Sequence, residues 1–244
     1  MSIVPASAHP GGQHRPRQVL VAAVAFLLGG LTVVMLYHFD VVGGSDSTSS
    51  ATEGSGVAAT QAREVAAFQS VDLAGSNNVV IRVGEKQSVV VKADDNLLDR
   101  VTTEVHSGEL VIANTPGSFT TKSPMRVEID VPALDAVTLS GSGNIVVTGV
   151  DAKRLVVHLP GSGTLTGDGA ATHLDIAVGG SGMVQLTRLV ASDVRADVSG
   201  SGSIFVTATK RLDASVSGSG AILYTGSPQD VSRNVTGSGA ITGS

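Results

Sequence analysis

The 244-residue sequence has no cysteine and no tryptophan, and only 3% of its residues are aromatic. The absence of cysteine excludes a disulfide scaffold, a lipoprotein thioether anchor and a cysteine-based zinc site. Charged residues are also scarce, at 15%, whereas 30 residues are glycine. This composition is not that of a helical bundle, which is rich in Leu, Ala, Glu and Lys. It is typical of short strands of small β-branched residues separated by tight turns.

Acidic residues are absent from the first 39 positions, where Arg15 and Arg17 are the only charged side chains. Asp40 and the residues after it hold all 21 acidic residues but only 14 of the 16 basic ones, so this larger part is net negative. It contains no cluster of Lys and Arg, and neutralising the phosphates of a nucleic acid requires one. We therefore expect no nucleic-acid partner.

An uncharged apolar run of 19 residues extends from Val19 to Tyr37. As a helix rising about 1.5 Å per residue, it would cross a hydrocarbon core of about 30 Å. Because arginines precede it and acidic residues follow, the positive-inside rule places the N-terminus in the cytoplasm and the rest outside. A cleaved signal peptide is the alternative, but its apolar core is usually shorter and Val42–Gly44 is a poor cleavage site. We therefore expect an uncleaved signal anchor.

These features divide the chain into four parts. We expect a short cytoplasmic tail at 1–18, a transmembrane signal anchor at 19–39, a flexible Gly/Ser/Thr-rich linker at 40–62 and a folded domain at 63–244. In this arrangement the chain is a single-pass protein of the cell membrane, and its domain faces the periplasm or the extracellular space.

The folded part contains an internal repeat, in which Gly-Ser-Gly recurs six times at intervals of 20, 19, 20, 18 and 19 residues. Apolar residues recur two, four and six positions before the first glycine and four positions after it, with polar or small residues between them. This period-2 alternation predicts one strand that runs into each Gly-Ser-Gly corner and another that leaves it. The repeat glycines are Gly141, Gly143, Gly161, Gly163, Gly180, Gly182, Gly200, Gly202, Gly218, Gly220, Gly237 and Gly239.

A unit of about 19 residues cannot bury its apolar face alone, but stacked units can. We therefore predict an all-β fold, a right-handed parallel β-helix (solenoid), with continuous apolar columns inside it. Glycine is expected at the corners because the chain turns there through positive φ and because the next coil stacks directly on the backbone. Asp135 and Arg233 interrupt the apolar columns in the first and last copies, as expected for terminal repeats.

The sequence before the first full repeat is less regular. Val71–Val79 has the same register with Asn77 in place of the second glycine, and predicts a degenerate first coil in which Asn77 adopts positive φ. Beyond it we expect a strand at 87–93, a short helical turn at 94–100, and a hairpin of strands 101–105 and 109–113.

The sequence offers no convincing site for catalysis, a metal or a cofactor. His106, His158 and His173 do not have the spacing of metal ligands. The Gly-Ser-Gly corners are followed by strand residues, whereas a phosphate-binding loop leads into a helix N-terminus. We therefore expect no catalytic residue, no metal and no cofactor.

Charged residues at one outward position of successive repeats predict a surface charge ladder. Asp175, Arg195 and Asp213 each lie five residues before the corner glycine, and would alternate in sign at about 4.8 Å spacing. A pair of carboxylates that cleaves a glycoside is the alternative interpretation. The intervening arginine stabilises the charged form of both carboxylates, whereas a general acid must carry a proton. We therefore favour a structural ladder.

Three segments resemble the bacterial head GIN domain family of auto-transporter adhesins. They are the LSGSGNIVV type of repeat, which begins at Leu139, the MRVEIDVPAL run at 125–134 and the AILYTGSP run at 221–228. The resemblance covers about 63–244. It implies a right-handed β-helix on an exported or surface protein, and it brings no catalytic residues.

From these observations we expect a non-catalytic, outward-facing module for binding or adhesion, or a structural module of the cell envelope. Its partner would be a cell-wall glycan or an envelope protein. Two alternatives are a polysaccharide-cleaving β-helix enzyme and an envelope-sensing partner of a signalling protein. The last coil, at Gly243 and Ser244, has no evident cap, and its open strand edge predicts a homo-oligomer.

Overall fold

The computed structural model describes residues 19–28, 31–40, 51–84 and 86–244, which belong to two compact units, 1–49 and 50–244. In the first unit, β1 (Val19–Leu28) and β2 (Leu31–Asp40) pair as antiparallel strands. The sequence predicts a transmembrane helix here, so the structure differs from that prediction. Gly29 and Gly30 stand between the two strands in the sequence, and glycine is a poor helix former.

No helix in the described parts of the chain is both long enough and apolar enough to cross a membrane. The tail predicted at 1–18, and residues 41–50 of the predicted linker, lie outside the described residues.

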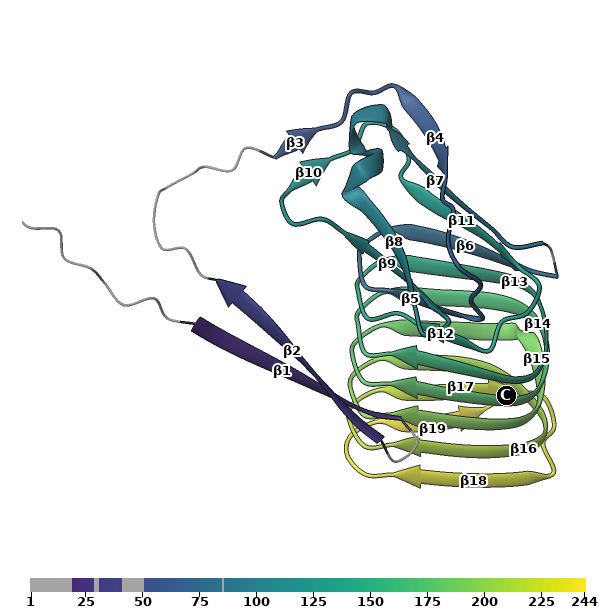
Figure 1. Cartoon of the computed structure of the whole chain (residues 1–244). Coiled ribbons are helices and arrows are strands. Elements are labelled where there is room, and N and C mark those ends of the chain that lie inside the picture. Colours follow the sequence, from purple (N-terminus) through teal and green to yellow (C-terminus); the bar gives the residue numbers. More distant parts are fainter. Residues whose placement is uncertain (1–18, 29–30, 41–50, 85) are drawn as a thin grey trace, which may run out of the picture. The chain divides into compact units, whose positions relative to one another are not determined.

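The second unit contains a β-solenoid of stacked coils (Figure 1). Each of four long strands pairs in parallel with the next, and the shorter strands β17 and β18 pair with the two ends of the last long strand. β19 then pairs with β17. The strands are β13 (Asn144–Leu159), β14 (Thr164–Val178), β15 (Met183–Val198), β16 (Ser203–Val216), β17 (Ala221–Thr225), β18 (Asp230–Val235) and β19 (Ala240–Gly243). The predicted all-β solenoid is confirmed, while its right-handedness stays a prediction.

Each coil has two flat sides that meet at the Gly-Ser-Gly corner. We call the outward residues three, five and seven positions before the corner the entry face, and those three, five and seven positions after it the exit face. From β13 to β17 the residues between these outward positions point inward and are buried, whereas those of β18 are exposed. The exit face is formed by the first part of each long strand together with β17 and β19, and the entry face by the last part together with β18.

The core consists of aliphatic columns that run through the stack. Burying one Val, Leu or Ile side chain contributes about 1.5–3 kcal/mol, and parallel pairing repeats this gain at every coil. Two of the predicted columns are Val79, Ile145, Leu165, Val184, Ile204, Ile222 and Leu73, Leu139, Leu159, Val178, Val198, Val216, which are all at most 2% exposed. Their last predicted members differ, since Ile241 is half-buried and Val235 is 45% exposed. The narrow space between the sides accommodates aliphatic side chains and few rings, which agrees with the low aromatic content.

The corner glycines are required mainly by close stacking of the backbone. A Cβ on Gly161 would come closer than 3.0 Å to the carbonyl oxygens of Gly141 and Ser140 in the previous coil, and most other repeat glycines are crowded in the same way. Only Gly237 among the twelve has φ in the left-handed region, at 132°. The predicted turn through positive φ is therefore wrong for the other eleven, and the predicted stacking requirement is what explains them.

The degenerate first coil is present. β5 (Ser70–Leu73) pairs in parallel with β12 (Ala136–Thr138), and β6 (Asn78–Val83) pairs with β13. The prediction that Asn77 adopts positive φ is wrong. Its buried amide instead exchanges two hydrogen bonds with the Asn114 side chain, with N–O distances of 3.1 and 3.3 Å.

Antiparallel strands extend the stack at its N-terminal end. The elements predicted between 87 and 113 are all found, and two positive φ angles, 52° at Ser107 and 83° at Gly108, form the hairpin turn. The elements are β7 (Ser88–Asp94), the 3-10 helix η1 (Asp95–Arg100), β8 (Val101–His106), β9 (Glu109–Asn114) and β11 (Arg126–Val131). β9 pairs in parallel with β5, and β11 lies between β6 and β7.

Part of the predicted linker is ordered into strands. β3 (Thr52–Glu53) pairs with β10 (Phe119–Thr120), and β4 (Ala58–Ala62) pairs with β7. Asp94, which is fully buried, connects the elements: its carboxylate accepts hydrogen bonds from the backbone N–H groups of Gly56, Lys122 and Ser123. The order of this segment is thus imposed by partners distant in the sequence.

Candidate functional site

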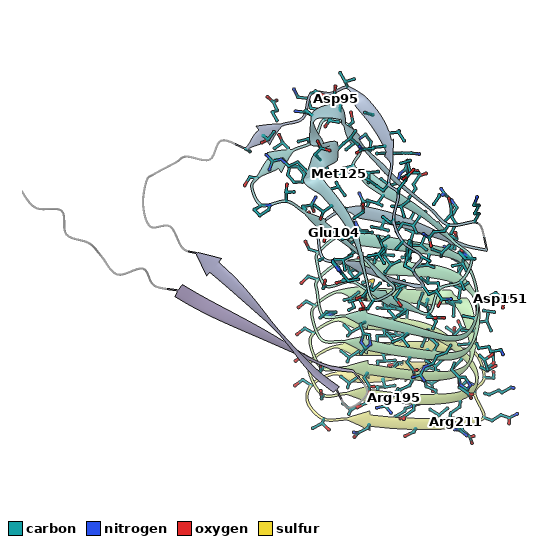
Figure 2. All side chains as sticks on the ribbon, viewed as in Figure 1. Asp95, Glu104, Met125, Asp151, Arg195 and Arg211 are labelled. Atoms are coloured by element: carbon teal, nitrogen blue, oxygen red, sulfur yellow. The ribbon has the colours of Figure 1, made fainter. Side chains whose placement is uncertain are left out.

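The entry face is dominated by ion pairs. Asp175, Arg195 and Asp213 lie in register on β14, β15 and β16, as the sequence predicts for their positions. Figure 2 shows Arg195 and Arg211 projecting from the coils. The ion pairs and their N–O distances are Arg154–Asp175 at 2.7 Å, Arg195–Asp197 at 3.0 Å, Arg211–Asp230 at 3.8 Å and Arg195–Asp213 at 4.0 Å. In addition, the His173 ring nitrogen Nδ1 lies 3.2 Å from the Asp193 carboxylate.

Arg195 is the centre of this arrangement. Its hydrogen bond to Asp197, followed by the charges of Asp197 and Asp213, raises the pKa of the guanidinium above its ordinary value. The surrounding carboxylates are held in exposed pairs with a cation, so the face neutralises itself by internal contacts. A glycosidase would instead separate two carboxyl groups around a bound sugar and desolvate one of them. The geometry favours the ladder interpretation over a catalytic pair.

The three candidate histidines lie in different places. His158 and His173 are on the entry face, in β13 and β14, whereas His106 ends β8 and lies 3.1 Å from the Glu104 carboxylate. Within the described residues, no group of three or more His, Asp or Glu side chains could hold a metal ion.

The exit face differs sharply from the entry face. Its outward residues from β13 to β19 include a single ionisable side chain, Asp168, which accepts a hydrogen bond from the Gly149 N–H. Most of the remainder carry hydroxyl, amide or apolar groups: Asn144, Val146, Thr148, Thr164, Thr166, Met183, Gln185, Thr187, Ser203, Phe205, Thr207, Ala221, Leu223, Thr225, Ala240 and Thr242. This uncharged surface was not singled out by the sequence reasoning.

The middle column of the exit face, five positions after each corner, holds apolar and polar side chains together, and the column seven positions after the corner is mainly threonine. Phe205 is in register with Gln185 on one side and Leu223 on the other, and Leu223 is 40% exposed. Along the margin, the Thr207 hydroxyl lies 2.8 Å from the Thr187 carbonyl oxygen and 2.7 Å from the Thr225 hydroxyl. These contacts hold the threonine side chains in fixed positions.

A charged cluster bounds the exit face at its N-terminal end. On β6, β7 and β11, the Glu128 carboxylate lies 2.8 Å from the Lys92 ammonium and 3.2 Å from the Arg126 guanidinium, and Arg82 pairs with Asp130 at 3.3 Å. The hydrogen bond from Lys92 is the largest effect on Glu128 and lowers the pKa of its carboxyl group, although burial acts in the opposite direction.

Two acidic residues on the entry side are partly desolvated. Burial raises the pKa of Asp72, despite a hydrogen bond of 2.8 Å from the Ser140 hydroxyl. Burial and the Asp72 charge raise the pKa of Glu109. The two residues come from β5 and β9, which pair in parallel although β6, β7, η1 and β8 lie between them in the sequence, so no local sequence pattern indicates that they are neighbours.

A model of the family described as "putative auto-transporter adhesin, head GIN domain" matches residues 67–228. The chain belongs to the head GIN domain family. This confirms the resemblance seen in the sequence. A search of curated proteins found no match.

Solved structures share this fold. A putative adhesin from Bacteroides fragilis is 22% identical, with a TM-score of 0.67, and the alignment covers 79% of this chain and 99% of that one. A putative adhesin from Parabacteroides distasonis, also 22% identical, has a TM-score of 0.51 and coverages of 80% and 100%. A protein of the same organism described as a putative lipid binding protein is 20% identical, again with a TM-score of 0.51 and coverages of 80% and 100%. At these identities the likeness shows the fold alone.

Proposed function

We propose that this head GIN domain protein is a non-catalytic binding or adhesion module displayed on the outside of the cell membrane. The observation that carries the proposal is the form of the solenoid, in which a rigid stack of coils presents two long flat faces. Stacked repeats are suited to binding because they offer an extended surface with a fixed spacing of chemical groups. The family description as an adhesin supports the same function.

The membrane attachment is the second part of the proposal. It is supported by the apolar run from Val19 to Tyr37, by Arg15 and Arg17 before it and by the acidic residues after it. In this arrangement residues 1–18 lie in the cytoplasm and the solenoid lies in the periplasm or the extracellular space. A cell-wall glycan or an envelope protein is the partner, and the open edge of the last coil is available for self-association.

A polysaccharide-cleaving enzyme would use a different arrangement of charges. The acidic residues of the entry face on β14 to β18 are paired with arginine or histidine on an exposed surface, and the partly desolvated Asp72 and Glu109 lie apart from them on β5 and β9. Substrate binding by a hydrolase or lyase normally involves a cleft that positions the reacting bond. The entry face therefore gives no specific support to the catalytic alternative.

Co-sedimentation tests the proposal. The full chain, kept soluble with a detergent that has no sugar headgroup, would be mixed with isolated cell walls, insoluble polysaccharides or inert silica. The pellet would be assayed for protein and the supernatant for released sugar. We expect retention on wall or polysaccharide above the silica background, without released sugar. Time-dependent sugar release would contradict the non-catalytic assignment, and retention no greater than on silica would contradict binding to these materials.

A further inference from the structure

We propose that the exit face from β13 to β19 is the binding surface, and that its ligand is an uncharged polysaccharide. This inference rests on the proposed binding function and specifies the face and the ligand class. The entry face lies on the same coils and has the same strand spacing, so it serves as an internal comparison.

The contrast in charge between the two faces selects the exit face and its ligand. The entry face is covered by arginine, histidine and aspartate side chains that are engaged with one another, and a ligand would have to displace these contacts. Among its outward positions the exit face has one ionisable group, Asp168, over six consecutive strands, and the exposed Arg188 lies in register with Asp168 on β15 at the margin of the face. A charged polymer would lose its hydration there without gaining a partner of opposite charge, whereas an uncharged polymer would not bear this cost.

The chemical groups of the exit face complement a sugar chain. Sugar rings present C–H groups on their faces and hydroxyl groups around their edges. Phe205 and Leu223 supply half-exposed and exposed apolar surface in the middle column, and Met183, in the column next to the corner, is 36% exposed. Around them, Thr164, Thr166, Gln185 and other polar residues supply hydrogen-bond donors and acceptors. Apolar and polar groups thus lie side by side on the face, as they do on a sugar chain.

The size of the exit face argues against a second copy of the chain as its occupant. Six strands at about 4.8 Å spacing, each with about five residues at 3.3 Å, cover roughly 450 Å². A stable protein interface buries about 800 Å² on each partner. The charged cluster around Glu128 ends the neutral surface at β6, so the face does not extend further in that direction. A polysaccharide has no such requirement, because it can bind many copies along its length.

A pair of matched double variants tests this inference. Gln185→Lys with Leu223→Lys adds two cations to the exit face, on β15 and β17. Ala177→Lys with Ser215→Lys adds two cations to the entry face, on β14 and β16, also two coils apart. The full-length proteins would be co-sedimented with microcrystalline cellulose and chitin as uncharged probes, and with chitosan and peptidoglycan sacculi as charged probes. Circular dichroism would check the fold of each protein, and Gln185→Lys alone would replace the exit-face pair if that pair does not fold.

We expect the unaltered chain to bind at least one uncharged probe, the exit-face pair to reduce the bound fraction at least tenfold, and the entry-face pair to change it less than twofold. Equal binding by both pairs, or loss only in the entry-face pair, overturns the choice of face while leaving the binding function intact. Binding of the unaltered chain to charged probes alone overturns the ligand class but not the binding function. If the unaltered chain binds no probe, both the ligand class and the proposed binding of glycans are overturned.

Discussion

The Arg233 guanidinium lies over the ring of Tyr224, 5.1 Å from its centroid, and donates a hydrogen bond to the Tyr224 hydroxyl. Arg233 occupies a column position that is apolar in the preceding coils, for example Ala214. Tyr224 comes from β17 and is only 6% exposed, and its ring lies where a Cβ on Gly243 would be. Tyr224 is thus buried in the last coils, and the exposed Arg233 covers its ring.

Tyr224→Ala should destabilise the C-terminal coils more than Tyr224→Phe. The alanine variant removes a buried ring and the stacking partner of Arg233, with an expected loss of about 3 kcal/mol. The phenylalanine variant removes one hydrogen bond, which contributes about 1 kcal/mol. Urea unfolding measures both losses, and hydrogen exchange should locate the faster opening in residues 221–243. Equal losses in the two variants would show that the ring itself contributes little.

Gly161→Ala should be among the most damaging single changes in the solenoid. Its new Cβ would collide with carbonyl oxygens of the previous coil, and the backbone there is fixed by the hydrogen bonds of the corner. We expect a loss of at least about 3 kcal/mol, in line with other overpacked backbone sites. Ser162→Ala is the matched control: Ser162 is exposed at the same corner, and its change should be within about 0.5 kcal/mol. Thermal and urea unfolding compare the two.

The regular part of the fold was predictable because each contact repeats at a nearly constant sequence separation. The positions of Leu159 and Val178, for example, follow from counting back from the next corner. The strands at 52–62 were not predictable in this way, because Asp94 and the 120–123 loop hold them, and no periodicity records such a contact. The two hydrogen bonds between the side-chain amides of Asn77 and Asn114 likewise join residues that are far apart in the sequence.

The candidate site shows the same division. The register of Asp175, Arg195 and Asp213 follows from the repeat length, and the structure has them in adjacent coils. The neutral exit face could have been found by comparing the outward residues on the two sides of each corner. The charged positions stand out in the repeat, whereas a surface with almost no charged residues carries no motif of its own.

Asp94→Asn should lower the free energy of unfolding at neutral pH more than at acidic pH. Burial raises the pKa of Asp94, but hydrogen bonds from Lys122, Ser123 and Gly56 lower it by more, so the folded value lies below the unfolded value of about 3.9. The carboxylate therefore contributes stability above pH 3.9 or so, and this is lost as the pH falls through the folded pKa.

The measurement for Asp94 is the free energy of unfolding from pH 2 to pH 7, together with hydrogen exchange of residues 51–57. The difference between the unaltered chain and Asp94→Asn should be largest near pH 7 and shrink toward pH 2. Asp95→Asn is the neighbouring control, because the Asp95 carboxylate accepts a hydrogen bond from the exposed Ser55 hydroxyl rather than joining three segments. A difference that is constant with pH would contradict the role of the charge.

Asp72→Asn should have the opposite effect at neutral pH. Because burial raises the folded pKa of Asp72, its contribution to stability is fully present below the unfolded value and is lost as the pH rises through the folded pKa. Asparagine keeps an acceptor for the Ser140 hydroxyl and removes the buried charge beside Glu109. We expect a higher unfolding midpoint at pH 7 and no gain at pH 3. A lower midpoint at pH 7 would mean that the charged hydrogen bond outweighs the cost of burial.

Arg195→Asp should reveal how far the entry face depends on alternating charge. The variant would place a fourth carboxylate among Asp175, Asp197 and Asp213, and opposed like charges on neighbouring strands each cost about 0.2–1 kcal/mol. We expect a loss of about 1–2 kcal/mol at low salt, most of which disappears in 1 M NaCl because salt screens exposed charges. Arg195→Gln is the control, since it removes the cation without adding an anion and should cost less than about 1 kcal/mol. Urea unfolding at both salt concentrations separates the possibilities: a loss that salt does not reduce would assign the effect to packing of the arginine stem rather than to charge.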